Sequence, residues 1–290
     1  MAEKAHSGGW MQWAVRGRTL DLRSEALIMG VVNVTPDSFS DGGQFFNESA
    51  AVDHGLALAA EGAAILDIGG ESTRPGAEPV SAAEQIRRVV PVIRRLAGVW
   101  AGVLSVDTTL AEVAEAALEA GAHVVNDVSG LRADPAMAAV VKSRAAGVVV
   151  MHMQGEPRTM QKAPKYDDVA AEVAAFFAGR LDFCRAAGLQ EESLVFDPGI
   201  GFGKTLEHNL SLLRALDRLS PPGRPLMLGV SRKSFIGAVL GSREIDDRFW
   251  PTVALTSLGR ERGGRLFRVH DVRANAEALK MSQAILSGGA

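Results

Sequence analysis

The sequence predicts a closed (β/α)8 barrel with an N-terminal β-hairpin. Eight short apolar runs alternate with segments of helical periodicity, and no linker or break in composition interrupts them. The runs are almost continuously apolar, as in parallel strands that are covered on both faces. Alternating strands and helices indicate parallel βαβ units, and eight such units can close into one barrel. An open doubly wound sheet is the alternative.

The elements can be placed in order along the chain. We expect a flexible tail over residues 1–12 and a single domain over residues 13–290, with a hairpin in the stretch MQWAVRGRTLDLRS that could plug the lower end of the barrel. The expected strands cover residues 26–33, 63–70, 102–107, 122–127, 147–152, 193–199, 225–231 and 265–270. Helical segments are expected from near Glu48 and at residues 81–98, 109–121, 166–188 and 205–219.

Two helix ends carry recognisable signals. Ser81 is followed three residues later by Glu84, which predicts a capping box at the start of a helix. Gly121 follows the last periodic residue of another helix, at the position where glycine commonly ends helices.

Composition excludes several classes of function. The chain has 290 residues and a net charge of −3, so it carries no basic footprint for nucleic acid. No apolar run approaches the length of a membrane span, and the polar N-terminus lacks the apolar core of a signal peptide. Cys184 is the only cysteine, which rules out an internal disulfide and fits a reducing compartment. We therefore expect a cytoplasmic protein with small-molecule substrates.

Polar residues gather where the predicted strands end. In such barrels the active site lies at the C-terminal ends of the strands. The residues at these ends are Asn33, Asp67, Asp107, Asn126 with Asp127, His152, Asp197, Ser231 with Arg232 and Lys233, and Arg268 with His270. Any one of them could simply cap the next helix. A complete ring of such groups costs stability unless it has ligands or partners, so the ring predicts a binding site.

The charges in this ring are sorted along the chain. Carboxylates and amides dominate the middle strands, where Asp107, Asn126 and Asp197 could grip a flat heterocycle that offers N–H donors. Cations dominate the last two strands, and loops at this position often hold phosphate. Arg268 and His270 lie two residues apart on one strand and should meet the same anion, although Arg268 could instead pair with a nearby acid.

Two rival interpretations involve single motifs. The stretch FDPGIGFGKT resembles a P-loop, but Pro198 stands where that motif requires glycine, so the nucleoside triphosphatase interpretation fails. Its glycines should instead let the backbone approach a flat ligand beside Phe202. Lys233, at a strand end, could form a Schiff base as in aldolases.

Taken together, the motifs resemble one family. The stretches MGVVNVTPDSFSDGG, DIGGESTRPGA, SVDT, NDVSG, VVMHMQGEPRTMQ, FDPGIGFGKTLEHNLSLL, GVSRKSFIG and RVHDV are similar to those of dihydropteroate synthases, in the same order and over nearly the whole chain. The resemblance implies a barrel enzyme of folate synthesis that joins p-aminobenzoate to the 6-methyl carbon of a dihydropterin and displaces pyrophosphate with the help of Mg²⁺. It also implies a homodimer formed through helices on the far wall of the barrel.

The resemblance assigns roles to individual residues. It implies that Asn33 ligates the Mg²⁺ and, with Arg268 and His270, holds the pyrophosphate. The implied pterin-binding residues are Asp107, Asn126, Met151, Asp197, Phe202 and Lys233. The implied p-aminobenzoate pocket comprises Thr73, Arg74, Pro75 and Ser234. Asp41, Arg74, Asp107 and Lys233 are the expected catalytic residues.

The first loop is long and polar for a strand-to-helix connection. We expect residues 35–46 to form a lid that excludes water from a cationic intermediate, with ESTRPGA as its partner. One departure from the family pattern follows the seventh strand, where Trp250-Pro251 and the stretch GRERGG at residues 259–264 put the helix packing there in question. A pterin-binding methyltransferase and a non-catalytic pterin or phosphate binder remain alternatives.

Overall fold

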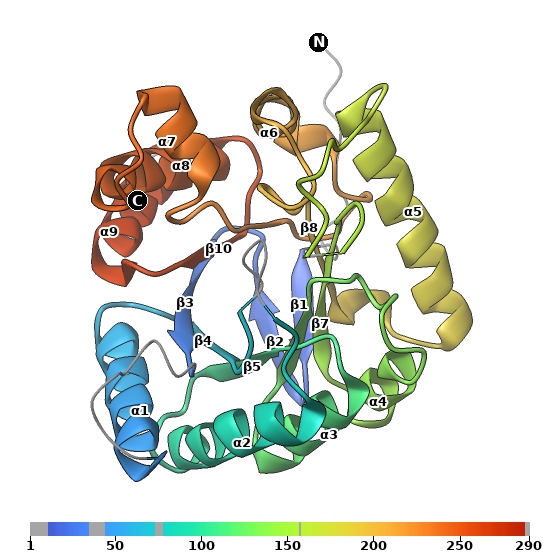
Figure 1. The fold of residues 1–290 in the computed structure, drawn as a ribbon, viewed down its shortest axis with the longest axis vertical. Coiled ribbons are helices and arrows are strands. Elements are labelled where there is room, and N and C mark those ends of the chain that lie inside the picture. The colour runs from blue at the N-terminus through green and yellow to red at the C-terminus, as the bar shows by residue number, and fades with distance from the viewer. Residues whose placement is uncertain (1–10, 35–43, 73–77, 157, 288–290) are drawn as a thin grey trace.

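The computed structural model describes residues 11–34, 44–72, 78–156 and 158–287. In this part of the chain a ring of helices surrounds eight parallel strands (Figure 1). The hydrogen-bonded order of the strands is β8-β7-β6-β5-β4-β3-β10-β9. A parallel bridge between Phe196 and Leu226 joins β8 to the start of β9. The predicted barrel is therefore confirmed, and the open sheet is excluded.

The strands lie where the apolar runs predicted them. Their bounds are β1 Gln12–Val15, β2 Arg18–Asp21, β3 Leu27–Asn33, β4 Ile65–Gly69, β5 Val103–Asp107, β6 Val124–Asp127, β7 Gly147–Met151, β8 Leu194–Asp197, β9 Met227–Leu228 and β10 Leu266–Val269. The helices are α1 Gln44–Ala60, α2 Ala82–Val99, α3 Ala111–Ala120, α4 Met137–Ser143, α5 Val169–Ala187, α6 Leu206–Arg214, α7 Ser234–Leu240, α8 Phe249–Glu261 and α9 Val272–Leu286. None of the helices in the described ranges is long and apolar enough to cross a membrane.

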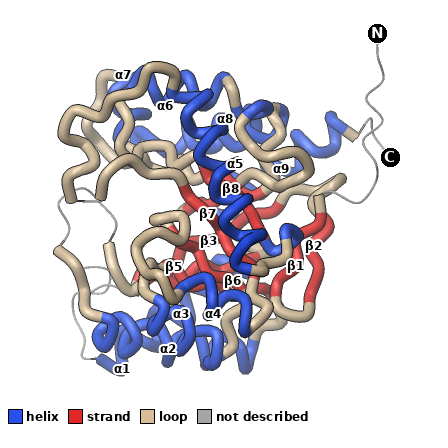
Figure 2. Tube along the Cα trace, turned by 90° about the vertical axis from the view of Figure 1, so that its right-hand side faces the viewer, coloured by secondary structure: helices blue, strands red, loops and turns tan. Residues whose placement is uncertain are grey.

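The hairpin of β1 and β2 closes one end of the barrel, which we call the floor (Figure 2). Its turn places Arg16 and Gly17 at positive φ angles of 40° and 76°, as tight hairpin turns require. Trp13 is completely buried, and its indole N–H donates to the carbonyl oxygen of Ser193 at 2.9 Å. The hairpin residues Trp13, Val15 and Leu22 share one buried cluster with residues from the strands. The predicted plug is confirmed.

We call the opposite end of the barrel the mouth. The register of the strands aligns several polar residues there. Asn33 is level with Gly69, Gly69 with Asp107, and Asp107 with Asn126. Asn33, Asp107 and Asn126 therefore lie at one level of the barrel, with the Gly69 backbone between Asn33 and Asp107.

The helix-end signals were partly right. The Ser81 hydroxyl accepts a hydrogen bond from the Glu84 amide at 3.3 Å, as predicted. The Glu84 carboxylate pairs with Arg87 and Arg88 and not with the Ser81 amide, so the second bond of the predicted capping box is not formed. Gly121 ends α3 with a φ angle of 121°.

The Trp250-Pro251 departure does not disturb the packing of α8. Both residues lie in the first turn of this helix, where proline is tolerated. Gly259 is required, because a Cβ there would lie 2.8 Å from Leu228 and 2.9 Å from Phe267. The Thr256 hydroxyl donates to Asn275 Oδ1 at 2.7 Å, which joins α8 to α9.

Candidate active site

A buried hydrogen-bonded network lies at the centre of the mouth. Asp67, on β4, has no exposed surface, and its Oδ2 accepts hydrogen bonds from Asn126 Nδ2 at 2.9 Å and from Arg268 Nε at 2.7 Å. A second guanidinium nitrogen of Arg268 donates to Asp107 Oδ2 at 2.8 Å. Four strands, β4, β5, β6 and β10, thus supply one connected group of side chains.

The charges in this network are not balanced, because one guanidinium faces two carboxylates. Burial raises the pKa of Asp107, and the neighbouring charge of Asp67 adds to this, while Arg268 opposes it. Burial alone would lower the pKa of Arg268, but the two carboxylates outweigh burial and hold its pKa above the ordinary value. The network therefore favours a permanent cation beside a carboxyl group that is reluctant to ionise.

Asp197 and Lys233 form the second part of the mouth. Asp197 Oδ1 accepts a hydrogen bond from the Gly199 amide at 2.7 Å, and burial raises its pKa, with Lys233 opposing. Burial lowers the pKa of Lys233 to about 8. The Lys233 ammonium donates to the carbonyl oxygen of Ile200 and lies 4.3 Å from the centroid of the Phe202 ring, within range of a cation–π interaction.

Two glycines bring these parts together. A Cβ at Gly69 would lie 3.5 Å from Asp107 Cβ and 3.9 Å from Asn33 Oδ1. A Cβ at Gly229 would lie 3.7 Å from Asp197 Oδ2 and 3.9 Å from Arg268 Cβ. Because neither glycine has a side chain, the polar side chains on the strands that flank it can lie close to one another.

An apolar wall completes the predicted heterocycle site. Met151 is buried in a cluster with Val128, Met153 and Met160, and Phe202 packs against this cluster. Met151 is level with Asp197 across β7 and β8. The structure therefore brings the predicted apolar residues next to the predicted polar ones.

The expected separation of cations from carboxylates is wrong for Arg268. Closure of the barrel makes β10 a neighbour of β3, which is itself paired with β4. The Arg268 guanidinium therefore reaches the carboxylates of Asp67 and Asp107. The Nδ1 atom of His270 lies 3.0 Å from the Ser231 hydroxyl.

The remaining predicted residues have separate outcomes. Asn33 ends β3 half-buried, and Ser234 is exposed in the first turn of α7. Asp127 stabilises the turn after β6 instead of capping a helix, since it accepts hydrogen bonds from the Ser129 and Leu131 amides at 2.7 and 3.0 Å and α4 begins only at Met137. The predicted residues Asp41, Thr73, Arg74 and Pro75 lie outside the described residues. The lid, predicted over residues 35–46, lies outside them for residues 35–43.

Sequence reasoning gave two buried residues no individual role, although Asp67 was one of the predicted ring of strand-end residues. Asp67 joins Asn126 to Arg268, and a charged residue inside the apolar strand ILDIG was the available signal. Lys204 is only 3% exposed and holds the loop after β8. Its position between a glycine-rich stretch and a helix gave no indication of burial.

The described residues suit a magnesium ion that is coordinated mainly by substrate phosphates and waters, with few ligands from the protein. They include no group of three histidine, cysteine or acidic side chains that could form a protein cage. Mg²⁺ commonly binds through one or two protein oxygens together with substrate phosphates and waters. Asn33 Oδ1, close to Asp107 at the mouth, is an oxygen of the required kind.

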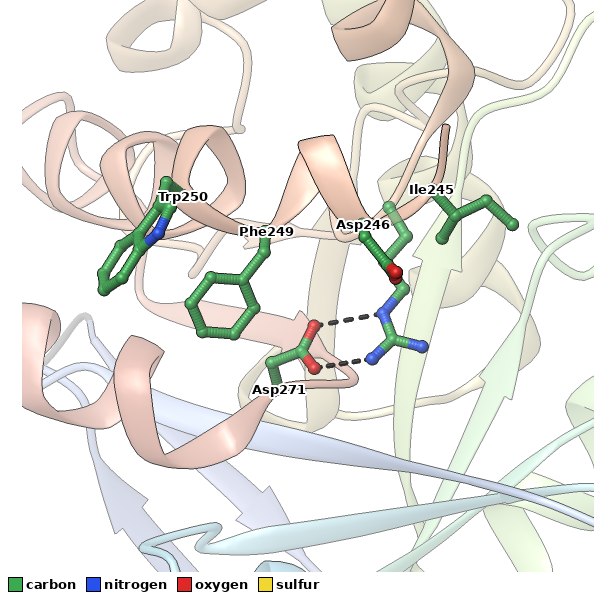
Figure 3. A pocket seen from close by; sticks show the side chains of 6 residues that line it. Ile245, Asp246, Phe249, Trp250 and Asp271 are labelled. Atoms are coloured by element: carbon green, nitrogen blue, oxygen red, sulfur yellow. Dashed lines mark hydrogen bonds and ion pairs between the residues drawn. The ribbon is translucent and has the colours of Figure 1, made fainter. Parts of the chain in front are cut away.

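A further pocket of about 310 Å³ lies beside the mouth (Figure 3). Its lining residues are Arg232, Ile245, Asp246, Phe249, Trp250 and Asp271. The Asp271 carboxylate accepts two hydrogen bonds from Arg232, at 3.0 and 2.5 Å. This pair neutralises the cation next to Lys233, so the pocket offers no free positive charge from Arg232.

Comparison with known proteins agrees with this geometry. Residues 29–270 match the family described as pterin binding enzyme. A dihydropteroate synthase from Mycobacterium leprae is 48% identical over 268 residues, which cover 90% of this chain and 94% of the relative. The structure of Yersinia pestis dihydropteroate synthase in a sulfonamide drug complex has a TM-score of 0.89 and 43% identity, covering 96% of this chain and 100% of that one. That of the Xanthomonas albilineans enzyme in complex with 7,8-dihydropteroate has a TM-score of 0.85 and 44% identity, with 95% and 99% coverage. The chain therefore belongs to the family of pterin binding enzymes and, within it, to the dihydropteroate synthases.

Proposed function

We propose that this enzyme condenses p-aminobenzoate with a dihydropterin that carries a hydroxymethyl pyrophosphate group, giving 7,8-dihydropteroate and pyrophosphate. The observation that carries the proposal is the buried network of Asp67, Asp107, Asn126 and Arg268 next to Asp197 and Lys233. A relative that is 44% identical over 95% of this chain holds the product of this reaction.

The pterin ring fits the polar and apolar groups of the mouth. Asp197 uses one carboxylate oxygen for the Gly199 amide, so its Oδ2 is left for N–H groups of the ring. Asn126 is oriented by Asp67, which takes an N–H of its amide and leaves Oδ1 as an acceptor. Met151 and Phe202 offer flat contacts beside these groups.

The pyrophosphate fits the ends of β3 and β10. Arg268 gives two of its nitrogens to carboxylates, and its remaining N–H donors can hold phosphate oxygens together with His270. Asn33 would hold a Mg²⁺ ion on the pyrophosphate, and this ion supplies Lewis-acid stabilisation of the leaving group.

We propose an SN1-like path for the bond change. The carbon–oxygen bond to pyrophosphate breaks first, and the pterin nitrogens delocalise the positive charge that develops on the methylene. The carboxylates of Asp107 and Asp197 lie within the same mouth and stabilise this charge. The amine of p-aminobenzoate then attacks the methylene carbon and loses a proton.

The p-aminobenzoate site is proposed at Ser234, together with Thr73, Arg74 and Pro75. The hydroxyl of Ser234 is exposed at the start of α7, directly after Lys233. We also expect sulfonamides to compete for this site, since a relative with 43% identity was solved with such a drug.

A homodimer and a cytoplasmic location are further parts of the proposal. Trp250, Ala254 and Leu258 are exposed along one face of α8, and Met281 and Ile285 along one face of the adjacent α9. A second copy of the chain could bury this apolar stripe against its own equivalent stripe. The single buried cysteine fits a reducing compartment.

Release of pyrophosphate tests the proposal. The enzyme should release it only when the dihydropterin pyrophosphate, p-aminobenzoate and Mg²⁺ are all present, and Asp197→Asn should abolish the release. Methyl transfer from a folate without pyrophosphate release would support a methyltransferase, and ligand binding without turnover a binding protein. Borohydride should trap no adduct on Lys233, whereas trapping would indicate a Schiff-base aldolase.

A further inference from the structure

We propose that Lys204 is a positioning residue for the apolar wall of the mouth: its buried side chain ties the loop of residues 199–204 to the end of β7 and thereby fixes Phe202 beneath Lys233. The inference rests on the proposed function, because it assigns Phe202 to the pterin site. Lys204 itself is not placed to touch the reacting atoms.

The contacts of Lys204 are unusual for a lysine, because its ammonium group is surrounded by acceptors. The Nζ atom lies 3.0 Å from the Gly199 carbonyl oxygen and 2.9 Å from that of Phe202. It also lies 3.1 Å from His152 Nδ1 and 3.4 Å from the His152 carbonyl oxygen. Two acceptors belong to the loop after β8 and two to the residue that follows β7, so the lysine joins the two strands' ends.

The neutral state of His152 suits its role as an acceptor for Lys204. Burial lowers the pKa of His152 to about 3, and the charge of Lys204 adds to the effect, so the imidazole is neutral and its Nδ1 can accept. Burial lowers the pKa of Lys204 to about 7, while the nearby Asp197 opposes this shift. A buried amine is costly to keep, which argues against an incidental position.

The backbone of the loop explains why such a tie is needed. Gly199 and Gly203 have φ angles of 64° and 59°, and a Cβ on either would lie 1.9 Å from the His152 oxygen or 2.5 Å from the Gln154 oxygen. This close approach excludes a side chain at these two positions, so within the loop Ile200 supplies the contact with the apolar core. Lys204, at the end of the loop, adds polar contacts to the carbonyl oxygens of Gly199 and Phe202.

The loop also has anchors of its own. Asn209 Oδ1 accepts from the Gly201 amide at 2.7 Å, and the Tyr166 hydroxyl donates to the Gly203 carbonyl oxygen at 2.9 Å. Neither bond involves Phe202, whose own amide donates to the Gly199 carbonyl oxygen at 3.0 Å, an acceptor that Lys204 also contacts. We therefore expect loss of Lys204 to displace Phe202 without unfolding the loop or the barrel.

A double-mutant cycle tests the inference through pterin affinity, measured by calorimetry with the dihydropterin pyrophosphate. Lys204→Met and Phe202→Leu should each weaken binding about tenfold, and the double variant should be no weaker than the worse of the two single variants. A loss of about a hundredfold in the double variant, or no loss in Lys204→Met, would overturn the proposal. Lys162→Met, which removes an exposed lysine, is the matched control and should bind as wild type.

Amide hydrogen exchange provides a second readout that does not depend on catalysis. Lys204→Met should raise exchange at residues 199–203 at least tenfold and leave β8 unchanged. Should Lys204→Met fail to fold, Lys204→Gln keeps two N–H donors, and its expected effects are the same in direction and smaller. Equal exchange in wild type and variant contradicts the positioning role, whereas wild-type enzyme that releases no pyrophosphate contradicts the proposed function instead.

Discussion

The floor and the mouth of the barrel are built on opposite principles. At the floor, Trp13, Val15 and Leu22 pack against apolar side chains from the strands, and the one indole N–H has its acceptor. At the mouth, Asp67 and Asp107 are buried around a single guanidinium. The floor therefore contributes to folding, while the mouth keeps groups whose burial costs free energy unless a ligand or partner compensates.

Two buried polar atoms without a hydrogen-bond partner add to this difference between the floor and the mouth. Asp67 Oδ1 and Ser105 Oγ, on neighbouring strands below the mouth, are buried and have no hydrogen-bond partner among the described residues. Buried polar atoms normally have partners, and exceptions concentrate at functional sites. The comparison leads to a general expectation: changes at the floor should reduce stability and spare activity, and changes at the mouth should do the reverse.

The largest expected effect is at the floor. Trp13→Ala removes the largest side chain of the plug and leaves a cavity, so the free energy of unfolding should fall by about 3–5 kcal/mol. Pyrophosphate release per folded molecule should stay within about twofold at a temperature where the variant is folded. Denaturant unfolding and activity on the same sample measure both. Thr19→Ala, exposed on β2, is the control and should change neither quantity. Loss of activity without loss of stability would show that the floor serves catalysis and not folding.

The next effect is at the mouth. Asp197→Asn removes a charged acceptor for the pterin ring, and affinity for the dihydropterin pyrophosphate should fall by roughly 2–5 kcal/mol. The free energy of unfolding should not fall, because burial already opposes ionisation of this carboxyl group and raises its pKa. Calorimetry and denaturant unfolding together test the prediction. Asp217→Asn, at an exposed carboxylate, should leave both measurements unchanged.

The same contrast explains what the sequence could predict. The eight strands, the plug and the ring of polar strand ends were predicted because each follows from a local pattern of apolar and polar residues. The reach of Arg268 to Asp67 could not be predicted, because it depends on which strands become neighbours when the barrel closes. The burial of Lys204 depends on a contact with His152, 52 residues earlier in the chain. Local patterns therefore specify the elements, and closure specifies the partners of long side chains.

The pH dependence of stability should differ in sign between the two ends. At the mouth, burial raises the pKa of Asp107 above its unfolded value of about 4. The folded protein then holds a proton that the unfolded chain has lost, so this group's contribution to stability falls as the pH rises from about 4 towards neutrality. Asp107→Asn should remove this decline. Parallel stability–pH curves for wild type and variant would contradict this prediction.

The smallest expected effect is at the floor, where stability should rise with pH, opposite to the decline expected at the mouth. His123 precedes β6 near the hairpin, accepts a hydrogen bond from the Leu104 amide, and has its pKa lowered to about 4 by burial and then by the charges of Arg18 and Arg16. Below pH 6.5 the unfolded chain binds a proton that the folded protein excludes, so stability is lost as the pH falls from about 6.5 to about 4. Because the imidazole is partly exposed, solvent should limit this loss to less than about 1 kcal/mol.

His123→Asn keeps an acceptor for the Leu104 amide and removes the titration. The variant should therefore lose less stability than wild type between pH 6.5 and 4, as measured by denaturant unfolding across this range. His54→Asn, on an exposed face of α1, is the matched control and should lose as much as wild type. If His123→Asn lost as much stability as wild type, His123 would not be the source of the acid sensitivity. The pH dependence of stability would then not differ in sign between the floor and the mouth.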